Sequence, residues 1–196
     1  MTKIRNTPFA SPLLAFLAAA LICSAAPALA QQAAPADPPA SPTAATPKPV
    51  GTFKAWSAYT FEDKGRLMCY TQGEPAGTIG KAADRGKAAV MVIQAPDAAA
   101  KDQVSIVLGF APPDGKSVSV TIGPKAGRGK KFTLKKFAVG RAWADSEKLD
   151  KQLVDAMKRY DWLVVYAVSS KSEKVQDTYN LTGFGDAYDA AVKACK

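Results

Sequence analysis

The chain contains no histidine, so the side chains left as candidates for catalysis or metal binding are cysteines, lysines, serines and carboxylates. It therefore cannot form a Ser-His-Asp triad, a Cys-His pair or a zinc site with a histidine ligand. The Ser-x-x-Lys and Gly-x-Ser-x-Gly motifs of other hydrolases are also absent from the sequence. Glu62 and Asp63 are neighbours on a strand, so their carboxylates point to opposite faces and cannot flank one bond. We expect a protein that is not an enzyme; the alternative is an enzyme whose Ser/Lys or carboxylate site forms only on folding.

Residues 123–131 (GPKAGRGKK) combine glycine and lysine, as a phosphate-binding loop does. The spacing does not fit that motif, because Pro124 stands where its first glycine is required and Lys131 where Ser or Thr is required. The flanking residues also have strand character, whereas a phosphate loop joins a strand to a helix. The segment is better explained as a flexible hairpin turn.

A run of basic residues without any acid begins in this turn, and the whole chain has 26 Lys and Arg against 17 Asp and Glu. The run consists of Lys125, Arg128, Lys130, Lys131, Lys135 and Lys136. One interpretation is a polyanion-binding site for lipopolysaccharide, anionic lipid or a host glycosaminoglycan, centred on the residues at the turn, Lys125, Arg128 and Lys130. The other interpretation is a solvated hairpin face. Nucleic acid is not an expected partner, because no recognised binding motif accompanies the charge.

The first thirty residues have the pattern of a secretory signal peptide. Lys3 and Arg5 precede an apolar stretch at 13–23, and Ala28-Leu29-Ala30 supplies a small-x-small cleavage site. We therefore expect residues 1–30 to be removed, so that the mature protein begins at Gln31.

Two alternatives to this cleavage remain. An uncleaved membrane anchor would need a longer apolar run than the sequence provides. A lipoprotein acylated at Cys23 would need a small residue where Ile22 stands. With cleavage, the mature protein is expected to be periplasmic or secreted, with outer-membrane association as a further option, and without a transmembrane segment.

Loss of the signal peptide removes Cys23 and leaves two cysteines, Cys69 and Cys195. An extracytoplasmic compartment favours disulfides, so we predict a bridge between them; two buried free thiols are the alternative. Tyr188, Val192 and Cys195 follow helical spacing, which puts Cys195 on the inward face of a final helix. Two cysteines without histidine do not make a metal site, and we expect no cofactor.

Residues 31–49 (QQAAPADPPASPTAATPKP) contain six Pro and six Ala and no large apolar side chain. Such a segment cannot form a core, so a disordered linker is expected. From residue 50 onward, short apolar and alternating runs are separated by Gly, Pro and Asp, which predicts one β-rich domain over 50–196. The aromatic side chains, among them Trp56 and Trp162, are expected to serve core and cross-strand packing.

Strands are predicted at 53–60, 66–72, 88–94, 103–110, 117–122, 131–139, 162–169 and 175–181. Pro112-Pro113-Asp114-Gly115 has turn chemistry, so 103–122 is predicted to be a hairpin. A helix should begin after Asp145 or Ser146 and end near Arg159, and a short final helix is predicted at 186–194. No β-α-β alternation occurs. We therefore expect a mainly β fold, an antiparallel β-sandwich or open barrel with one inserted helix and a short C-terminal helix.

An ordered set of short segments accompanies this pattern: WSAY at 56–59, Cys69-Tyr70, Ala142-Trp143-Ala144, LVDAMK at 153–158, DTYNLTGF at 177–184 and Cys195. Together with the signal peptide, this set resembles the invasion-associated locus B family of exported bacterial proteins. The resemblance implies an exported, β-rich, non-enzymatic protein with an envelope or host-interaction role, associated in some members with host-cell invasion. It carries over no catalytic residues. The partner stays unknown, with an envelope polyanion or a host surface component as candidates.

Overall fold

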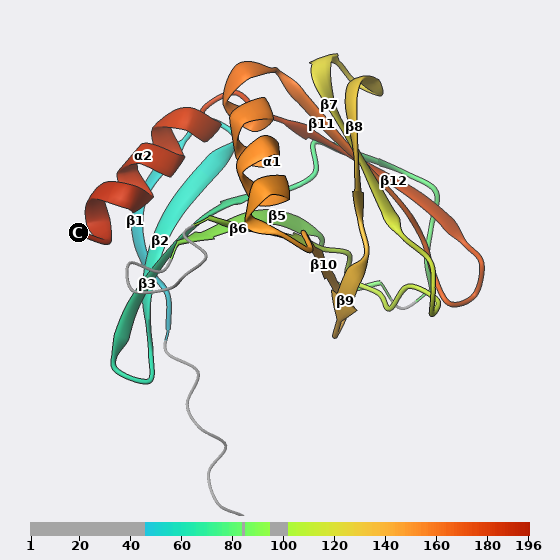
Figure 1. Cartoon of the computed structure of the whole chain (residues 1–196), viewed down its shortest axis with the longest axis horizontal. Helices are drawn as coiled ribbons and strands as arrows, with labels where there is room; N and C mark the ends of the chain where they lie inside the picture. The colour runs from blue at the N-terminus through green and yellow to red at the C-terminus, as the bar shows by residue number, and fades with distance from the viewer. Residues whose placement is uncertain (1–45, 84, 95–101) are drawn as a thin grey trace, which may run out of the picture. The chain divides into compact units, whose positions relative to one another are not determined.

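The computed structural model describes residues 46–83, 85–94 and 102–196, so the predicted signal peptide and most of the predicted linker lie outside it. The described residues form two antiparallel sheets and two helices (Figure 1). Sheet A contains, in spatial order, β1 (Lys48–Phe53), β2 (Trp56–Asp63), β3 (Arg66–Gly73), β5 (Ala89–Gln94), β6 (Gln103–Val107), β10 (Arg141–Trp143) and β9 (Lys136–Ala138). Sheet B contains β4 (Gly77–Ile79), β12 (Lys174–Asn180), β11 (Trp162–Val168), β7 (Val118–Lys125) and β8 (Arg128–Leu134).

The hydrophobic core lies between the inner faces of the two sheets. Val92 and Ile106 of sheet A belong to the same buried cluster as Val120 and Leu163 of sheet B. These residues alternate along their strands with residues that face outward, as expected when one side of each sheet is buried. The prediction of a mainly β fold is confirmed in its sandwich form, with one inserted and one C-terminal helix.

The inserted helix α1 (Glu147–Arg159) begins and ends where the sequence predicts. Ser146 is its N-cap, and its side-chain oxygen accepts a hydrogen bond from the Leu149 N–H. Leu153 and Met157 lie on one face of the helix and are buried in the core between the sheets. Neither α1 nor the second described helix, α2 (Phe184–Ala194), is long and apolar enough to cross a membrane.

Trp56 joins both sheets and α2. Its indole, 1% exposed, belongs to sheet A, and its Nε1–H donates a hydrogen bond of 2.9 Å to the carbonyl of Asn180 in sheet B. The ring also meets Phe184 of α2 edge-on, with the centroids 4.9 Å apart. Gly73 lies beneath the indole, where a Cβ atom would come within 2.8 Å of the ring. Only glycine fits at that position without displacing the tryptophan.

The predicted hairpin over 103–122 is wrong. Strand β6 pairs with β5 and β10 in sheet A, whereas β7 pairs with β11 and β8 in sheet B. The Pro112–Gly115 segment does contain a turn, in which the Lys116 N–H donates a hydrogen bond to the Pro113 carbonyl, but this turn lies on the connection from one sheet to the other. Turn chemistry fixes the local backbone direction, while the pairing partner is chosen by long-range packing.

Other strand boundaries also differ from the prediction. The strand predicted at 53–60 is two strands, because a turn with Lys54 at φ 56° separates β1 from β2. Strand β1 starts at Lys48, two residues before the predicted start of the domain at Val50. The strand predicted at 131–139 is divided at Lys135, where the chain passes from β8 in sheet B to β9 in sheet A. The short strands β4 and β10 were not predicted.

Candidate functional site

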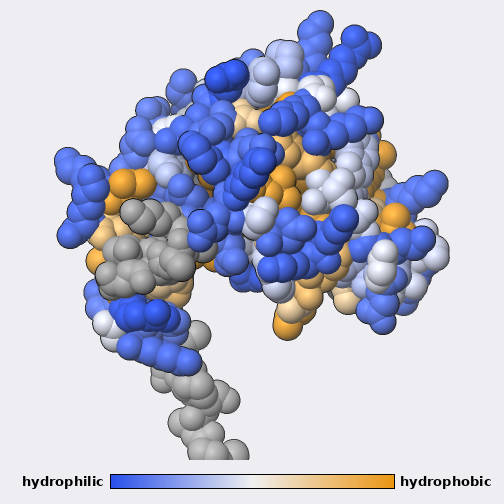
Figure 2. Space-filling model, viewed as in Figure 1, coloured by the Kyte–Doolittle hydropathy of each residue, from blue (hydrophilic) through white to orange (hydrophobic). Residues whose placement is uncertain are grey.

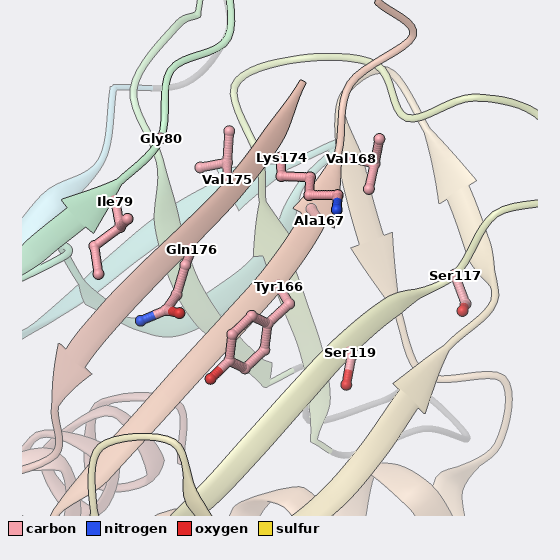
Figure 3. Close-up of a pocket in the computed structure, with 10 residues that line it drawn as sticks. All are labelled: Ile79, Gly80, Ser117, Ser119, Tyr166, Ala167, Val168, Lys174, Val175 and Gln176. Atoms are coloured by element: carbon pink, nitrogen blue, oxygen red, sulfur yellow. The ribbon is translucent and has the colours of Figure 1, made fainter. Parts of the chain in front are cut away.

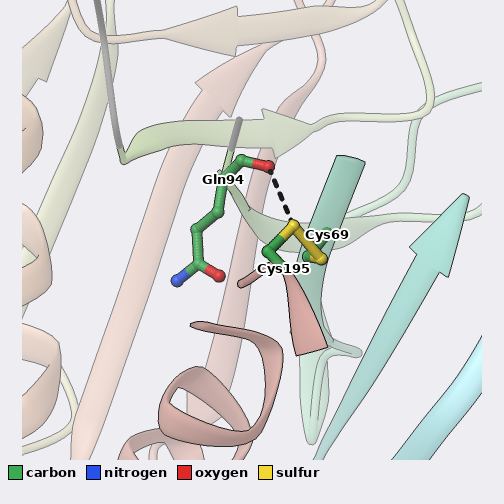
Figure 4. Close-up of a disulfide and its surroundings, with 3 residues drawn as sticks. All are labelled: Cys69, Gln94 and Cys195. Carbon is green, nitrogen blue, oxygen red and sulfur yellow. Dashed lines mark hydrogen bonds between the residues drawn. A yellow bond between two sulfur atoms is a disulfide. The ribbon is translucent and has the colours of Figure 1, made fainter. Parts of the chain in front are cut away.

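Cys69 of β3 and Cys195, at the C-terminal end of α2, form the predicted disulfide (Figure 4). Their Cα atoms are 5.8 Å apart, within the usual range for a bridge. Cys69 is 0% and Cys195 9% exposed, and the Cys195 sulfur lies 3.9 Å from the Gln94 carbonyl oxygen. The bridge therefore fastens the last turn of helix α2 to β3 of sheet A.

Small side chains let α2 lie close to sheet A around this bridge. Ala191 of the helix and Ala58 of β2 are both fully buried in one cluster with the two cysteines. At the start of the helix, Gly183 has φ 90°, and a Cβ atom there would lie 2.0 Å from the Phe53 carbonyl oxygen. Glycine is thus required at Gly183 for both conformation and space.

The basic run lies on the β7–β8 hairpin and on the chain that follows it. Lys125 pairs with Arg128 across the turn, which confirms the prediction of a hairpin there. All six basic side chains are exposed, and Figure 2 shows hydrophilic side chains over the turn end of β7 and β8. Within the described segments, none of the six forms an ion pair.

The six charges do not share one surface. Lys130 lies on the same side of β8 as the buried Phe132, with its ammonium 5.2 Å from the ring centroid. Lys131 points to the outer face of sheet B, opposite Thr121. Lys135 and Lys136 lie past the far end of β8. Of the predicted candidates, Lys125 and Arg128 share the turn, and Lys131 is nearest to them on the outer face.

Strand β8 is also an edge strand of sheet B, which gives its lysines a structural role. Exposed edges pair readily with strands of other molecules, and lysines or bulges on the edge discourage such pairing. The β7–β8 ladder changes register between Ile122 and Lys125, opposite Gly129 with φ 155°. The bulge bends the hairpin and keeps its edge from continuing as a flat strand.

A buried ion pair between Arg85 and Asp177 was not predicted. Asp177, 2% exposed, accepts hydrogen bonds from both terminal nitrogens of Arg85 and one of 2.7 Å from the Thr78 hydroxyl. The Arg85 Nε–H donates to the Leu108 carbonyl at 2.9 Å, and its guanidinium lies over Phe110. The Asp177 carboxylate therefore joins β12 to Thr78 of β4 and to Arg85, and Arg85 in turn contacts the segment after β6. The sequence feature that could have indicated this ion pair is Asp177 itself, an acidic residue at an inward-facing position of a strand with alternating apolar residues.

A second buried carboxylate, Asp150 of α1, accepts a 2.8 Å hydrogen bond from the Val104 N–H. The pKa of Asp150 is raised to about 6, chiefly by burial; the Val104 hydrogen bond opposes this rise, and the nearby carboxylates of Asp102, Glu147 and Asp145 add to it. The Tyr188 hydroxyl in turn donates its single proton to the Asp102 carboxylate and lies 2.9 Å from both of its oxygens. No group of described acidic or cysteine side chains is arranged to hold a metal ion.

Sheet B carries a shallow groove of about 450 Å³ on its outer face (Figure 3). Tyr166 of β11 lies in it between Gln176 of β12 and Ser119 of β7, with Ile79 of β4 beyond Gln176. The rest of the lining comes from Gly80, Ser117, Ala167, Val168, Lys174 and Val175. No carboxylate lines the groove.

These features define an antiparallel β-sandwich whose C-terminal helix is tied to one sheet by a disulfide. The model of the invasion associated locus B (IalB) protein family matches residues 56–192, and the chain belongs to this family. Its fold is similar to the crystal structure of invasion associated protein B from Bartonella henselae, with a TM-score of 0.50 and 16% sequence identity. That match covers 74% of this chain and 95% of the Bartonella chain. No curated protein matches the sequence significantly.

Replacing one half of the disulfide tests its contribution to stability. Cys195→Ser should lower the free energy of unfolding by about 2 to 5 kcal/mol, because the cross-link restricts the unfolded chain. Urea unfolding monitored by tryptophan fluorescence measures the change. A reductant should destabilise the wild type by a similar amount and leave the variant unaffected. Equal stability of the wild type with and without reductant would show that the bridge does not form.

Replacing Asp150 by asparagine tests the buried carboxylate. The folded pKa of about 6 lies above the ordinary 3.8, so the folded state binds more protons between these values and stability falls as pH rises through this window. Asp150→Asn keeps an oxygen for the Val104 N–H and removes the charge. At pH 7 the variant should be more stable by up to about 3 kcal/mol, and the gap should close toward pH 4. Parallel stability curves for the two proteins between pH 4 and 7 would show that the pKa of Asp150 is not raised in the folded protein.

Proposed function

We propose that this protein is exported by a bacterium to the periplasm or beyond and acts there as a binding protein rather than an enzyme. The pattern of residues 1–30, with Ala28-Leu29-Ala30 before Gln31, supports export. The buried Cys69–Cys195 disulfide supports a compartment in which such bonds persist. Membership of the IalB family supports a role at the bacterial envelope or at a host surface.

The surroundings of the polar side chains support a role without catalysis. The buried carboxylates of Asp177 and Asp150 are held by Arg85 and by the Val104 N–H, and neither lines the groove on sheet B. A catalytic lysine is normally desolvated so that its amine is activated. Every lysine in residues 46–83, 85–94 and 102–196 is exposed.

The observation that carries the binding function is the basic turn of the β7–β8 hairpin. Lys125 and Arg128 face each other across the turn, Lys130 and Lys131 follow, and no acidic residue intervenes in the sequence. Their unpaired, exposed charges attract a polyanion through long-range electrostatics. We assign this turn as the contact to an anionic component of the envelope, such as lipopolysaccharide or anionic lipid, or of a host surface.

Export is tested on the protein recovered from the periplasm or the medium. Its intact mass should correspond to a chain that starts at Gln31, less two hydrogen atoms for the disulfide between Cys69 and Cys195. An uncut N-terminus, or a diacylglyceryl group on Cys23, would contradict the proposed processing. A mass that shows both thiols reduced would contradict the proposed compartment.

Polyanion binding is tested by retention on immobilised heparin and on immobilised lipopolysaccharide. Salt elutes a protein held by charge, because the Debye length falls from about 10 Å at 0.1 M to about 3 Å at 1 M salt. Glutamate at Lys125, Arg128 and Lys130 together should lower the salt concentration needed for elution, because it removes the positive charges that hold the polyanion. The matched control places glutamate at three exposed lysines on other elements, Lys87, Lys148 and Lys196. Equal elution of the two variants would show that only net charge matters and that the turn is merely solvated.

A further inference from the structure

The outer face of sheet B presents a straight row of side chains across four strands. The pairing register aligns Ile79 with Gln176, Gln176 with Tyr166, and Tyr166 with Ser119. Ile79 is 68% and Tyr166 37% exposed, although most large apolar side chains of the described sheets are buried. Figure 3 shows the tyrosine ring between the amide of Gln176 and the hydroxyl of Ser119. Exposed apolar groups flanked by polar ones are typical of binding surfaces.

The composition of this row suits the ring of a sugar. A pyranose has an apolar C–H face that an aromatic side chain can cover, and hydroxyl groups at its rim that need polar partners. Tyr166 offers the ring face, while Gln176 and Ser119 offer a donor and acceptor on either side. The groove is shallow and open, so it fits part of an extended polymer better than a small ligand that must be enclosed.

Positive charge adjoins the tyrosine on two sides. The bent turn of the β7–β8 hairpin lies over the end of Tyr166, because a Cβ atom on Gly127 would be 3.2 Å from the tyrosine hydroxyl. Lys125 and Arg128 flank that turn, and Lys174 lines the groove itself. With no carboxylate in the groove lining, the surface is complementary to a ligand that carries negative charge as well as rings.

We propose that the outer face of sheet B binds an acidic polysaccharide. One sugar ring stacks on Tyr166, and sulfate or carboxylate groups of the same chain contact Lys174, Lys131 and the turn at Lys125 and Arg128. This inference rests on the polyanion-binding function proposed above and adds the chemical class of the polyanion. A polyphosphate would use the charges but has no ring to stack on the tyrosine.

The spacing of these contacts sets the length of the ligand. Lys131 stands two strands and two residues from Tyr166 in the pairing register. At about 4.8 Å per strand and about 3.4 Å per residue, this separation is about 12 Å. A single sulfated sugar that stacks on Tyr166 cannot span it, so affinity should rise steeply from a monosaccharide to an oligosaccharide.

The test compares two anionic probes of matched charge, a heparin hexasaccharide and linear polyphosphate, by calorimetric titration of the exported protein. Tyr166→Ala should weaken hexasaccharide binding about five- to tenfold and leave polyphosphate binding unchanged. Because the ring is uncharged, the salt dependence of hexasaccharide binding should keep its slope. Tyr166→Phe should bind like the wild type. Gln176→Glu, which places a carboxylate in the groove with little change in shape, should weaken the hexasaccharide more than polyphosphate.

Two results would overturn the proposal in distinguishable ways. If both probes bind equally and neither Tyr166→Ala nor Gln176→Glu discriminates between them, the groove is not a sugar site, while the polyanion function of the hairpin turn survives. If neither probe binds the wild type, the proposed function and this inference fail together. Circular dichroism spectra and thermal unfolding of each variant confirm that a loss of binding is not a loss of fold.

Discussion

The indole of Trp56 is the contact on which the arrangement of layers depends. It lies on the inner face of sheet A, donates its hydrogen bond to Asn180 of sheet B and meets Phe184 at the start of α2. Removing the indole N–H would leave the end of β12 without this link, and filling the space at Gly73 would displace the ring. The disulfide between Cys69 and Cys195 secures the opposite end of α2, so the helix is held at both ends on sheet A.

This packing decides which surfaces are free to bind. The inner faces of both sheets are filled by the core, and α2 covers one end of sheet A. On the outer face of sheet A, Tyr59 stacks on Tyr70 with centroids 5.0 Å apart, and Phe61 packs against Tyr70 edge-on. Tyr70 is consequently only 8% exposed, whereas Tyr166 on sheet B stands open beside a basic turn. The same residue type thus serves packing on one sheet and is available for recognition on the other.

Short-range sequence patterns predicted the elements that depend mainly on residues close together in the chain, above all the helices. The cap at Ser146 and the apolar face through Leu153 and Met157 located α1, and the helical spacing of Cys195 placed it against the sheet. The pairing of strands was harder to predict from the sequence. The residues of the turn at Pro112–Gly115 are the same whether the next strand pairs with the preceding strand or crosses to the other sheet. The groove could not be predicted for the same reason. Its row depends on β4, a strand of three residues with little periodicity, lying beside β12.

The proposed recognition of an acidic polysaccharide places the ligand on the outer face of sheet B, on Tyr166 and beside the basic turn. The most direct measurement is a map of backbone amide chemical shifts of the ¹⁵N-labelled protein during titration with a heparin hexasaccharide. We expect shifts at Tyr166, Gln176 and Lys131 and around the turn at Gly127, with little change at Tyr59 and Tyr70 on the outer face of sheet A. Shifts confined to sheet A, or to the hairpin turn without Tyr166 and Gln176, would contradict it.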